Sequence, residues 1–185
     1  MRILRADERT TQPWANGRGV TSEVATHMST APSGWDWRVS IATVADGGPF
    51  SAFPGHRRLL TPLDGSLSLR VDGRVRELRP HEVLEFDGQS ATCVRRPARP
   101  RLVLNVIFAP TWGGAVLAVS GKEDRGGAAP GLSEWVIVLA LHDGAAIGGL
   151  LLGRLDAVLF EPGEKPLDAN DSHFAVARMT ANSSV

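Results

Sequence analysis

The segment SLSLRVDGRVREL, residues 66–78, has the pattern of a β-hairpin. Leu67, Leu69 and Val71 alternate with other residues, as side chains do on one face of a strand. Asp72-Gly73 follows, a favoured two-residue hairpin turn, and Val75 starts the return strand. We therefore expect two antiparallel strands here.

Short segments of strand length recur on both sides of this hairpin, separated by 12 prolines and 20 glycines. In WRVSIA, residues 37–42, the large residues share one strand face, and Arg38, Ser40 and Ala42 share the other. Four segments are apolar apart from Asn105, as expected of strands buried on both faces: Leu102–Phe108, Val116–Val119, Trp135–Leu141 and Ala157–Phe160. Many short strands separated by turn signals predict an all-β sandwich or barrel.

Length and charge narrow the function classes. A chain of 185 residues buries roughly 70% of its unfolded surface, so neither a disulfide nor a metal is needed for stability. The 20 Lys and Arg balance 20 Asp and Glu, which argues against a nucleic-acid partner. No uncharged run approaches the ~20 apolar residues of a membrane span, and the N-terminus lacks a signal-peptide pattern. We expect a cytoplasmic protein.

The Gly-rich stretch Gly121–Pro130 is the best candidate for a boundary or loop, because it combines charge with chain breakers. The residues after it hold only a few predicted strands and would struggle to fold alone. We expect them to pack directly on the first part.

Candidate binding residues are concentrated in the first 60 positions. Trp14 and Asn16 lie beside a flexible Gly-x-Gly and could place an indole and an amide against a small ligand. The same residues could equally form a tight turn packed under Trp14. Arg57 could join Arg38 at the mouth of a barrel, or it could simply be solvated.

Arg38 and Ser40 carry more information, because their strand face looks into a cavity if the opposite face packs outward. A guanidinium there needs an anionic partner or several acceptors, since an unpaired buried charge is costly. That partner is either a structural acid or a ligand carboxylate. Asn105, polar within an apolar strand, either pins a loop or faces the same pocket.

Motifs for metal binding and nucleophilic catalysis are missing from the sequence. The five histidines lie far apart, with no His-x-His pair near a Glu. No Gly-x-Ser-x-Gly elbow, Cys-x-x-Cys or P-loop is present. We therefore expect no metal, no cofactor and no catalytic nucleophile.

Together these segments resemble the HutD/Ves family of small bacterial cupin-type proteins. The matching motifs, in the family's order, are WxNGxGxTxEV from residue 14, WRxSIA from residue 37, GPFSxFPG from residue 48 followed by Arg57 or Arg58, LxG from residue 63 and NVI from residue 105. The resemblance implies a bicupin, with a better-formed N-terminal barrel over residues 1–110 that carries the pocket and a smaller C-terminal barrel over residues 111–185.

The resemblance also implies a function. The HutD branch is associated with histidine utilisation and with binding of a small acid such as formylglutamate or urocanate, in an accessory or regulatory role without a secure enzymatic activity. On the family pattern, the ligand-binding residues are Trp14, Asn16, Thr21, Arg38, Ser40, Ser51, Arg57 and Asn105. The family usually has an acid two positions before the last Asn, where this chain has Val103. The motifs do not separate the HutD branch from the Ves branch.

Two alternatives from other classes stay open. Cupin barrels also host metal-free isomerases and epimerases, in which a His faces the substrate, and His56 is the first residue to test. A protein that only forms interactions, assembling as a homodimer through an exposed sheet, is the other alternative.

Overall fold

The computed structural model describes residues 1–14, 17–29, 34–120, 133–164, 169–170 and 173–182, and all regular elements in them are β-strands. The all-β prediction is therefore confirmed. None of the described residues forms a helix long and apolar enough to cross a membrane. The chain divides into two compact units, Thr10–Pro110 and the pair Met1–Arg9 with Thr111–Val185.

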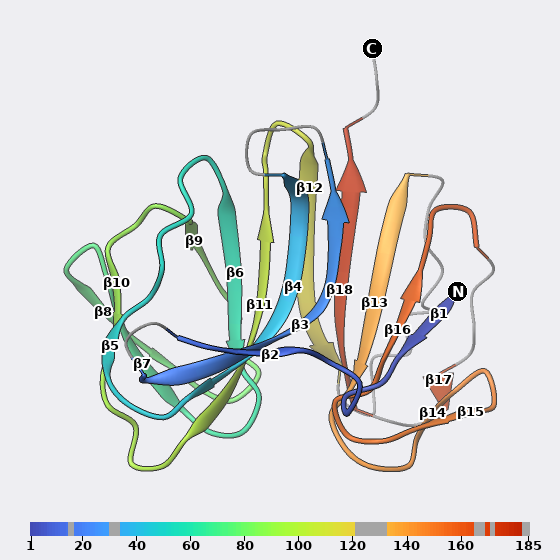
Figure 1. Ribbon diagram of the computed structural model, residues 1–185, viewed down its shortest axis with the longest axis horizontal. Coiled ribbons are helices and arrows are strands. Elements are labelled where there is room, and N and C mark those ends of the chain that lie inside the picture. Colours follow the sequence, from blue (N-terminus) through green and yellow to red (C-terminus); the bar gives the residue numbers. More distant parts are fainter. Residues whose placement is uncertain (15–16, 30–33, 121–132, 165–168, 171–172, 183–185) are drawn as a thin grey trace. The chain divides into compact units, whose positions relative to one another are not determined.

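The unit Thr10–Pro110 consists of two antiparallel sheets (Figure 1). The six-stranded sheet has the order β2 (Thr11–Pro13), β3 (Gly19–Met28), β4 (Trp35–Val44), β11 (Arg101–Phe108), β6 (Arg57–Pro62) and β9 (Leu84–Asp87). The four-stranded sheet has the order β5 (Gly48–Pro49), β10 (Thr92–Val94), β7 (Leu67–Val71) and β8 (Arg74–Leu78). One apolar core joins side chains of both sheets: Val44, Leu60, Leu67, Leu69, Leu78, Phe86, Val94 and Val103.

The predicted hairpin is β7 and β8, with Val71 opposite Arg74. Asp72 has φ 48° and Gly73 has φ 79°, and a type I′ turn requires positive φ at both central residues. The predicted strand pair and its turn are confirmed, and β8 begins at Arg74, one residue before the predicted start at Val75.

The other unit also contains two sheets. The five-stranded sheet has the order β1 (Arg2–Leu4), β16 (Ala157–Phe160), β13 (Glu134–Ala140), β18 (Phe174–Ala181) and β12 (Gly113–Ser120). The three-stranded sheet has the order β15 (Leu150–Leu152), β14 (Ala145–Ile147) and β17 (Ala169–Asn170). Among the described residues, the strands of both units form open sheets that do not close into hydrogen-bonded barrels.

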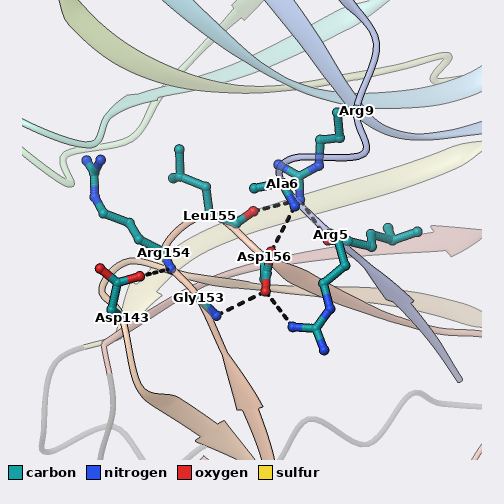
Figure 2. A network of polar contacts seen from close by, with 9 residues as sticks. Arg5, Ala6, Arg9, Asp143, Gly153, Arg154, Leu155 and Asp156 are labelled. Carbon is teal, nitrogen blue, oxygen red and sulfur yellow. Dashed lines mark hydrogen bonds and ion pairs between the residues drawn. The ribbon is translucent and has the colours of Figure 1, made fainter.

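Residues 1–9, which the sequence analysis assigned to the first domain, belong instead to the unit of the C-terminal residues. β1 pairs with β16, and the segment after β1 is fixed by Asp156 (Figure 2). This buried carboxylate accepts hydrogen bonds from Arg5 Nη1 at 2.6 Å, Ala6 N at 2.8 Å and Gly153 N at 3.0 Å. Burial alone would raise the pKa of the Asp156 carboxyl, but these bonds outweigh burial and lower it.

One of the four segments predicted to be buried on both faces differs from the prediction. Val116 in β12 is 63% exposed while Leu117 beside it is buried, so β12 is covered on only one of its two faces at this point. The other three segments are largely buried in β11, β13 and β16. The predicted boundary loop Gly121–Pro130 lies outside the described residues.

Candidate functional site

The unit Thr10–Pro110 contains a cavity of about 490 Å³. It is lined by side chains of β2, β3, β4, β11 and β6 and by residues of the segment 49–53. In the polar part of this lining, residues that are paired across neighbouring strands form rows perpendicular to the strands.

The first row is Arg38 of β4, Ile107 of β11 and Arg58 of β6, where Ile107 is paired with both arginines. The second row pairs Ser40 with Asn105. Residues that are paired across antiparallel strands lie on the same face, and rows two residues apart are separated by roughly 7 Å.

The third row is Gln12, Thr21 and Ala42. It lies four residues along β4 from Arg38, which is roughly 13 Å. The cavity therefore has a cationic end and a neutral polar end.

Arg58 is the buried cation of this site, with 7% of its surface exposed. Its Nε and Nη2 donate hydrogen bonds to Asn105 Oδ1 at 3.1 and 2.7 Å. The guanidinium carbon lies 4.7 Å from the centre of the Phe50 ring and 5.6 Å from that of Phe86. Burial, and then the charge of Arg38, lower the pKa of Arg58 to about 9, so the side chain remains charged at neutral pH.

Arg38 lies over two further rings, 5.3 Å from the centre of Trp35 and 5.2 Å from that of Phe53. Its Nε is buried without a hydrogen-bond partner, and the side chain makes no ion pair with any residue in the described ranges. The described lining of the cavity includes neither Asp nor Glu. Two guanidinium groups thus face one cavity without a carboxylate.

The neutral end is closed by Trp14. Its Nε1 donates a hydrogen bond to Thr21 Oγ1 at 2.8 Å, and its ring meets Phe50 edge to face at a centroid distance of 5.7 Å. A Cβ atom at Gly19 would lie 3.1 Å from the Trp14 ring and 2.5 Å from the Thr43 carbonyl oxygen, so only glycine fits there. The Trp14 backbone N donates a hydrogen bond to the Gly19 carbonyl oxygen at 2.9 Å, the Trp14 carbonyl oxygen accepts one from Gly17 N at 2.9 Å, and the indole lines the cavity.

The structure brings six of the eight predicted ligand-binding residues around this cavity: Trp14, Thr21, Arg38, Ser40, Ser51 and Asn105. Asn16 lies outside the described residues. Arg57 does not line the cavity. Its Nη2 binds Glu85 Oε1 at 2.8 Å on the opposite face of β6, and Arg58 occupies the position expected for Arg57.

Sequence reasoning named Arg58 only as the alternative to Arg57 in the family motif, and it assigned no binding role to Phe50 and Gln12, which also line the cavity. Adjacent strand residues point to opposite faces, so only one of Arg57 and Arg58 could reach the cavity. The residues that follow them in β6 are buried on both faces, and the pattern therefore did not reveal which one.

Two further expectations concern single residues. His56, the candidate catalyst of the isomerase alternative, is not among the cavity-lining residues. Its Nδ1 lies 2.9 Å from the Pro54 carbonyl oxygen, and its ring packs 4.4 Å from Trp35. Val103, which replaces the usual acid of the family, is fully buried in the core, so no carboxylate at that position pairs with Arg38.

Similarity to a bacterial pirin supports the fold alone. YhhW of Escherichia coli, in complex with nickel(II), has a TM-score of 0.65 and 12% identity, covering 98% of this chain and 99% of that one. The described cavity lining offers hydroxyls, amides and two guanidinium groups but no His, Cys, Asp or Glu. Such a donor set does not suit a divalent cation.

Curated proteins match parts of the chain, among them the two that follow. An uncharacterized 21.2 kDa protein in the hutC 3′ region of Pseudomonas putida is 35% identical over 112 residues, 60% of this chain and 59% of that protein. Protein Ves of Citrobacter koseri is 37% identical over 79 residues, 42% of this chain and 41% of that protein. The matched part thus spans less than two thirds of either relative.

Similarity over the whole length comes from a solved structure and a family model. HutD from Pseudomonas fluorescens SBW25 has a TM-score of 0.87 and 28% identity, covering 98% of this chain and 99% of that one. The HutD family model matches residues 6–177. With its all-β cupin-type fold, this chain belongs to the HutD family.

Proposed function

We propose that this protein binds a small carboxylic acid in the cavity of the unit Thr10–Pro110, as an accessory or regulatory protein of histidine or amino-acid catabolism. One observation carries the proposal: Arg38 and Arg58 face the cavity, and no described lining residue supplies a negative charge. A bound carboxylate would supply the negative charge that the two guanidinium groups lack in the described cavity lining.

The side chains of Arg38 and Arg58 are preorganised for binding such a ligand. Each guanidinium lies over a pair of aromatic rings, and Asn105 fixes the orientation of Arg58. Because this order exists before binding, little side-chain entropy is lost when an anion enters. Charge-assisted hydrogen bonds contribute about 1.5–3 kcal/mol each, which is enough to set the affinity for a small acid.

The cavity volume of about 490 Å³ falls within the range typical of small-molecule sites. The relative in the hutC 3′ region of Pseudomonas putida supports a role near histidine catabolism. Formylglutamate and urocanate are accordingly the first acids to test.

The experiment is isothermal titration calorimetry and thermal-shift measurement with both acids. Binding should raise the melting temperature of the wild-type protein by mass action. Arg58→Met should weaken binding by at least about tenfold, since one charge-assisted hydrogen bond accounts for roughly that factor.

Arg57→Met is the matched control, because Arg57 is the next residue of the same strand and pairs with Glu85 outside the cavity. It should bind both acids as the wild type does. The proposal fails if neither acid binds, or if the two variants lose affinity equally.

A further inference from the structure

Two edge strands of the unit Thr10–Pro110 border a groove. Among the described residues, β8 ends the four-stranded sheet and β9 ends the six-stranded sheet, so each is paired on one side only. The groove, of about 380 Å³, is lined by residues of both strands and shares no lining residue with the cavity that contains Arg38 and Arg58. Because an unpaired edge presents backbone N–H and C=O groups that can pair with another strand, this groove is a candidate site for strand addition.

The backbone groups of Val75 and Glu77 point to the free edge of β8. Val71 and Arg74 flank the two-residue turn and are hydrogen-bonded to each other, and such pairs alternate with non-hydrogen-bonded pairs along the ladder. Arg74 and Arg76 therefore bond to β7 through their backbone, whereas the N–H and C=O groups of Val75 and Glu77 face away from β7. No described residue forms a hydrogen bond with these outward groups.

Arg74 and Arg76 bring positive charge to this edge. Their partners in β7, Val71 and Leu69, pack on the apolar core, so both arginines lie on the inner face of the four-stranded sheet. Both side chains are exposed and line the groove. Neither guanidinium makes a hydrogen bond or an ion pair with a residue in the described ranges. The edge thus carries two cations, two residues apart, that are available to a ligand.

The two carboxylates of the groove lining already bind other groups of the protein. Asp72 accepts hydrogen bonds from Ser90 Oγ at 2.7 Å and from Ala91 N at 2.9 Å. Glu85 forms an ion pair with Arg57, whose Nη2 lies 2.8 Å from Glu85 Oε1. The charged groups that remain for a ligand are therefore guanidinium groups, which favour carboxylates.

A second copy of this chain does not fit the edge of β8. In a two-fold symmetric antiparallel pair of β8 strands, one residue lies opposite its own copy. If Arg74, Arg76 or Glu77 occupies that position, it meets a like charge. If Val75 occupies it, Arg74 lies opposite the partner's Arg76. Like charges directly opposite destabilise a strand pair, so this edge disfavours pairing with itself and favours a strand of opposite charge.

We infer that the edge of β8 binds an extended acidic segment of a partner protein by strand addition. The segment carries carboxylates at two positions that are two residues apart, next to Arg74 and Arg76, and an apolar residue between them. That apolar residue lies on the outer face next to Val75, which is 58% exposed. The backbone of Val75 and Glu77 supplies the hydrogen bonds, and the two arginines supply the specificity.

The test measures the fluorescence anisotropy of labelled peptides with the full chain at low ionic strength. The peptide Ser-Glu-Val-Glu-Val-Ser should bind at least about threefold tighter than its analogue with Gln in place of Glu, since two exposed ion pairs together contribute roughly that factor. The peptide Ser-Glu-Glu-Val-Val-Ser has the same composition, but only one of its carboxylates can lie on the inner face. It should bind more weakly than the alternating peptide.

Val75→Pro tests the backbone contact. Because the N–H of Val75 points to the free edge, proline removes a donor for the incoming strand and no hydrogen bond to β7. Binding of the alternating Glu peptide should fall at least about threefold, since a lost hydrogen bond costs roughly that factor. Val75→Ile keeps the N–H group and should bind the peptide as the wild type does. A thermal transition in each variant shows that it is folded.

Charge reversal tests the side chains. The double variant Arg74→Glu with Arg76→Glu should bind Ser-Lys-Val-Lys-Val-Ser more tightly than the alternating Glu peptide, which reverses the wild-type order. Arg70→Glu is the matched control, because Arg70 is an exposed arginine of the neighbouring strand β7 that does not line the groove. This variant should keep the wild-type order.

The inference is wrong if the Glu and Gln peptides bind equally, if none of the peptides binds, or if both Val75 variants bind the Glu peptide as the wild type does. Tighter binding of a single-stranded oligonucleotide than of the Glu peptide would show a general site for polyanions and would also contradict it. None of these results bears on the binding of small acids, because the groove and the cavity have no lining residue in common.

Discussion

Two arginines of one unit, Arg5 and Arg9, can be compared with two of the other, Arg38 and Arg58, because the groups around them differ. Arg5 and Arg9 in the unit of the chain termini bind groups of the protein itself, namely the Asp156 carboxylate and the carbonyl oxygens of Leu4 and Leu155 (Figure 2). In the other unit, the guanidinium groups of the cavity lie over aromatic rings, and Asn105 is the only described residue that binds one.

This difference separates structural arginines from binding arginines. A partly buried cation with an internal acid connects two parts of the fold, and its loss costs stability. A buried cation without an acid costs stability in the free protein and gains its partner only when an anion binds. The two sites should therefore respond to substitution with opposite signs.

The largest expected effect is on the site with internal partners. Asp156→Ala removes the acceptor of two backbone N–H groups and of Arg5, and we expect the free energy of unfolding to fall by about 2–4 kcal/mol. The ion pair itself adds little, since the side chain of Arg5 is 41% exposed. Urea denaturation followed by circular dichroism measures the change.

Asp143→Ala is the control for this substitution. Asp143 also accepts a backbone hydrogen bond, from Arg154 N at 2.7 Å, but at an exposed position. Its loss should change the free energy of unfolding by less than about 1 kcal/mol. Equal losses in both variants would contradict the importance of the buried network.

The sequence predicted most of the fold because its signals are local. The 66–78 hairpin has a turn with strict dihedral requirements, and β4 has Trp37, Val39 and Ile41 on one face and less hydrophobic residues on the other. The position of residues 1–9 could not be predicted in this way. β1 is three residues long, and its partner β16 lies more than 150 positions away, so no local pattern links them.

Residues of the candidate site could be predicted where the alternation of side chains along a strand showed which residues share a face. Arg38 and Ser40 were found because the opposite face of β4 consists of large apolar residues, and Asn105 because it is polar within an apolar strand. Arg57 was chosen over Arg58 as the binding candidate because β6 is buried on both faces, so the sequence pattern does not show which arginine faces the cavity. Phe50 and Gln12 line the cavity because of the tertiary arrangement of their segments, and the spacing of residues in the sequence does not predict that arrangement.

A smaller effect, of the opposite sign, is expected at the cavity. Arg58→Met replaces a buried cation that has no acid with an apolar side chain of similar length. The free energy of unfolding without ligand should stay the same or rise by up to about 2 kcal/mol, as for other buried charges replaced by apolar residues. The same urea titration measures it.

A fall of more than about 1 kcal/mol in Arg58→Met would mean that Arg58 is a structural residue of the core, like Asp156 in the other unit. Arg57→Met controls for the loss of an arginine from the same strand, because its pair with Glu85 is exposed.

The smallest effect lies in the pH dependence of stability and again differs between the two sites. The native pKa of Asp156 is lowered, so its contribution is complete above the unfolded-state pKa of about 4 and is lost as the pH falls through the native value. Asp156→Asn should therefore lose less stability than the wild type between about pH 5 and 2, and Arg58→Met should keep the wild-type slope there.

The alkaline range tests the other site with the reverse sign. The pKa of Arg58 is lowered to about 9, so above that pH the unfolded chain binds more protons at this residue than the folded one. Linkage then requires that the wild-type protein gain stability relative to Arg58→Met as the pH rises past about 9. Urea titrations of both proteins between about pH 7 and 10 measure this difference. If the difference in free energy of unfolding between the two proteins stays constant across that range, the buried guanidinium keeps its proton. Burial without an acid then destabilises the charged form of Arg58 less than expected.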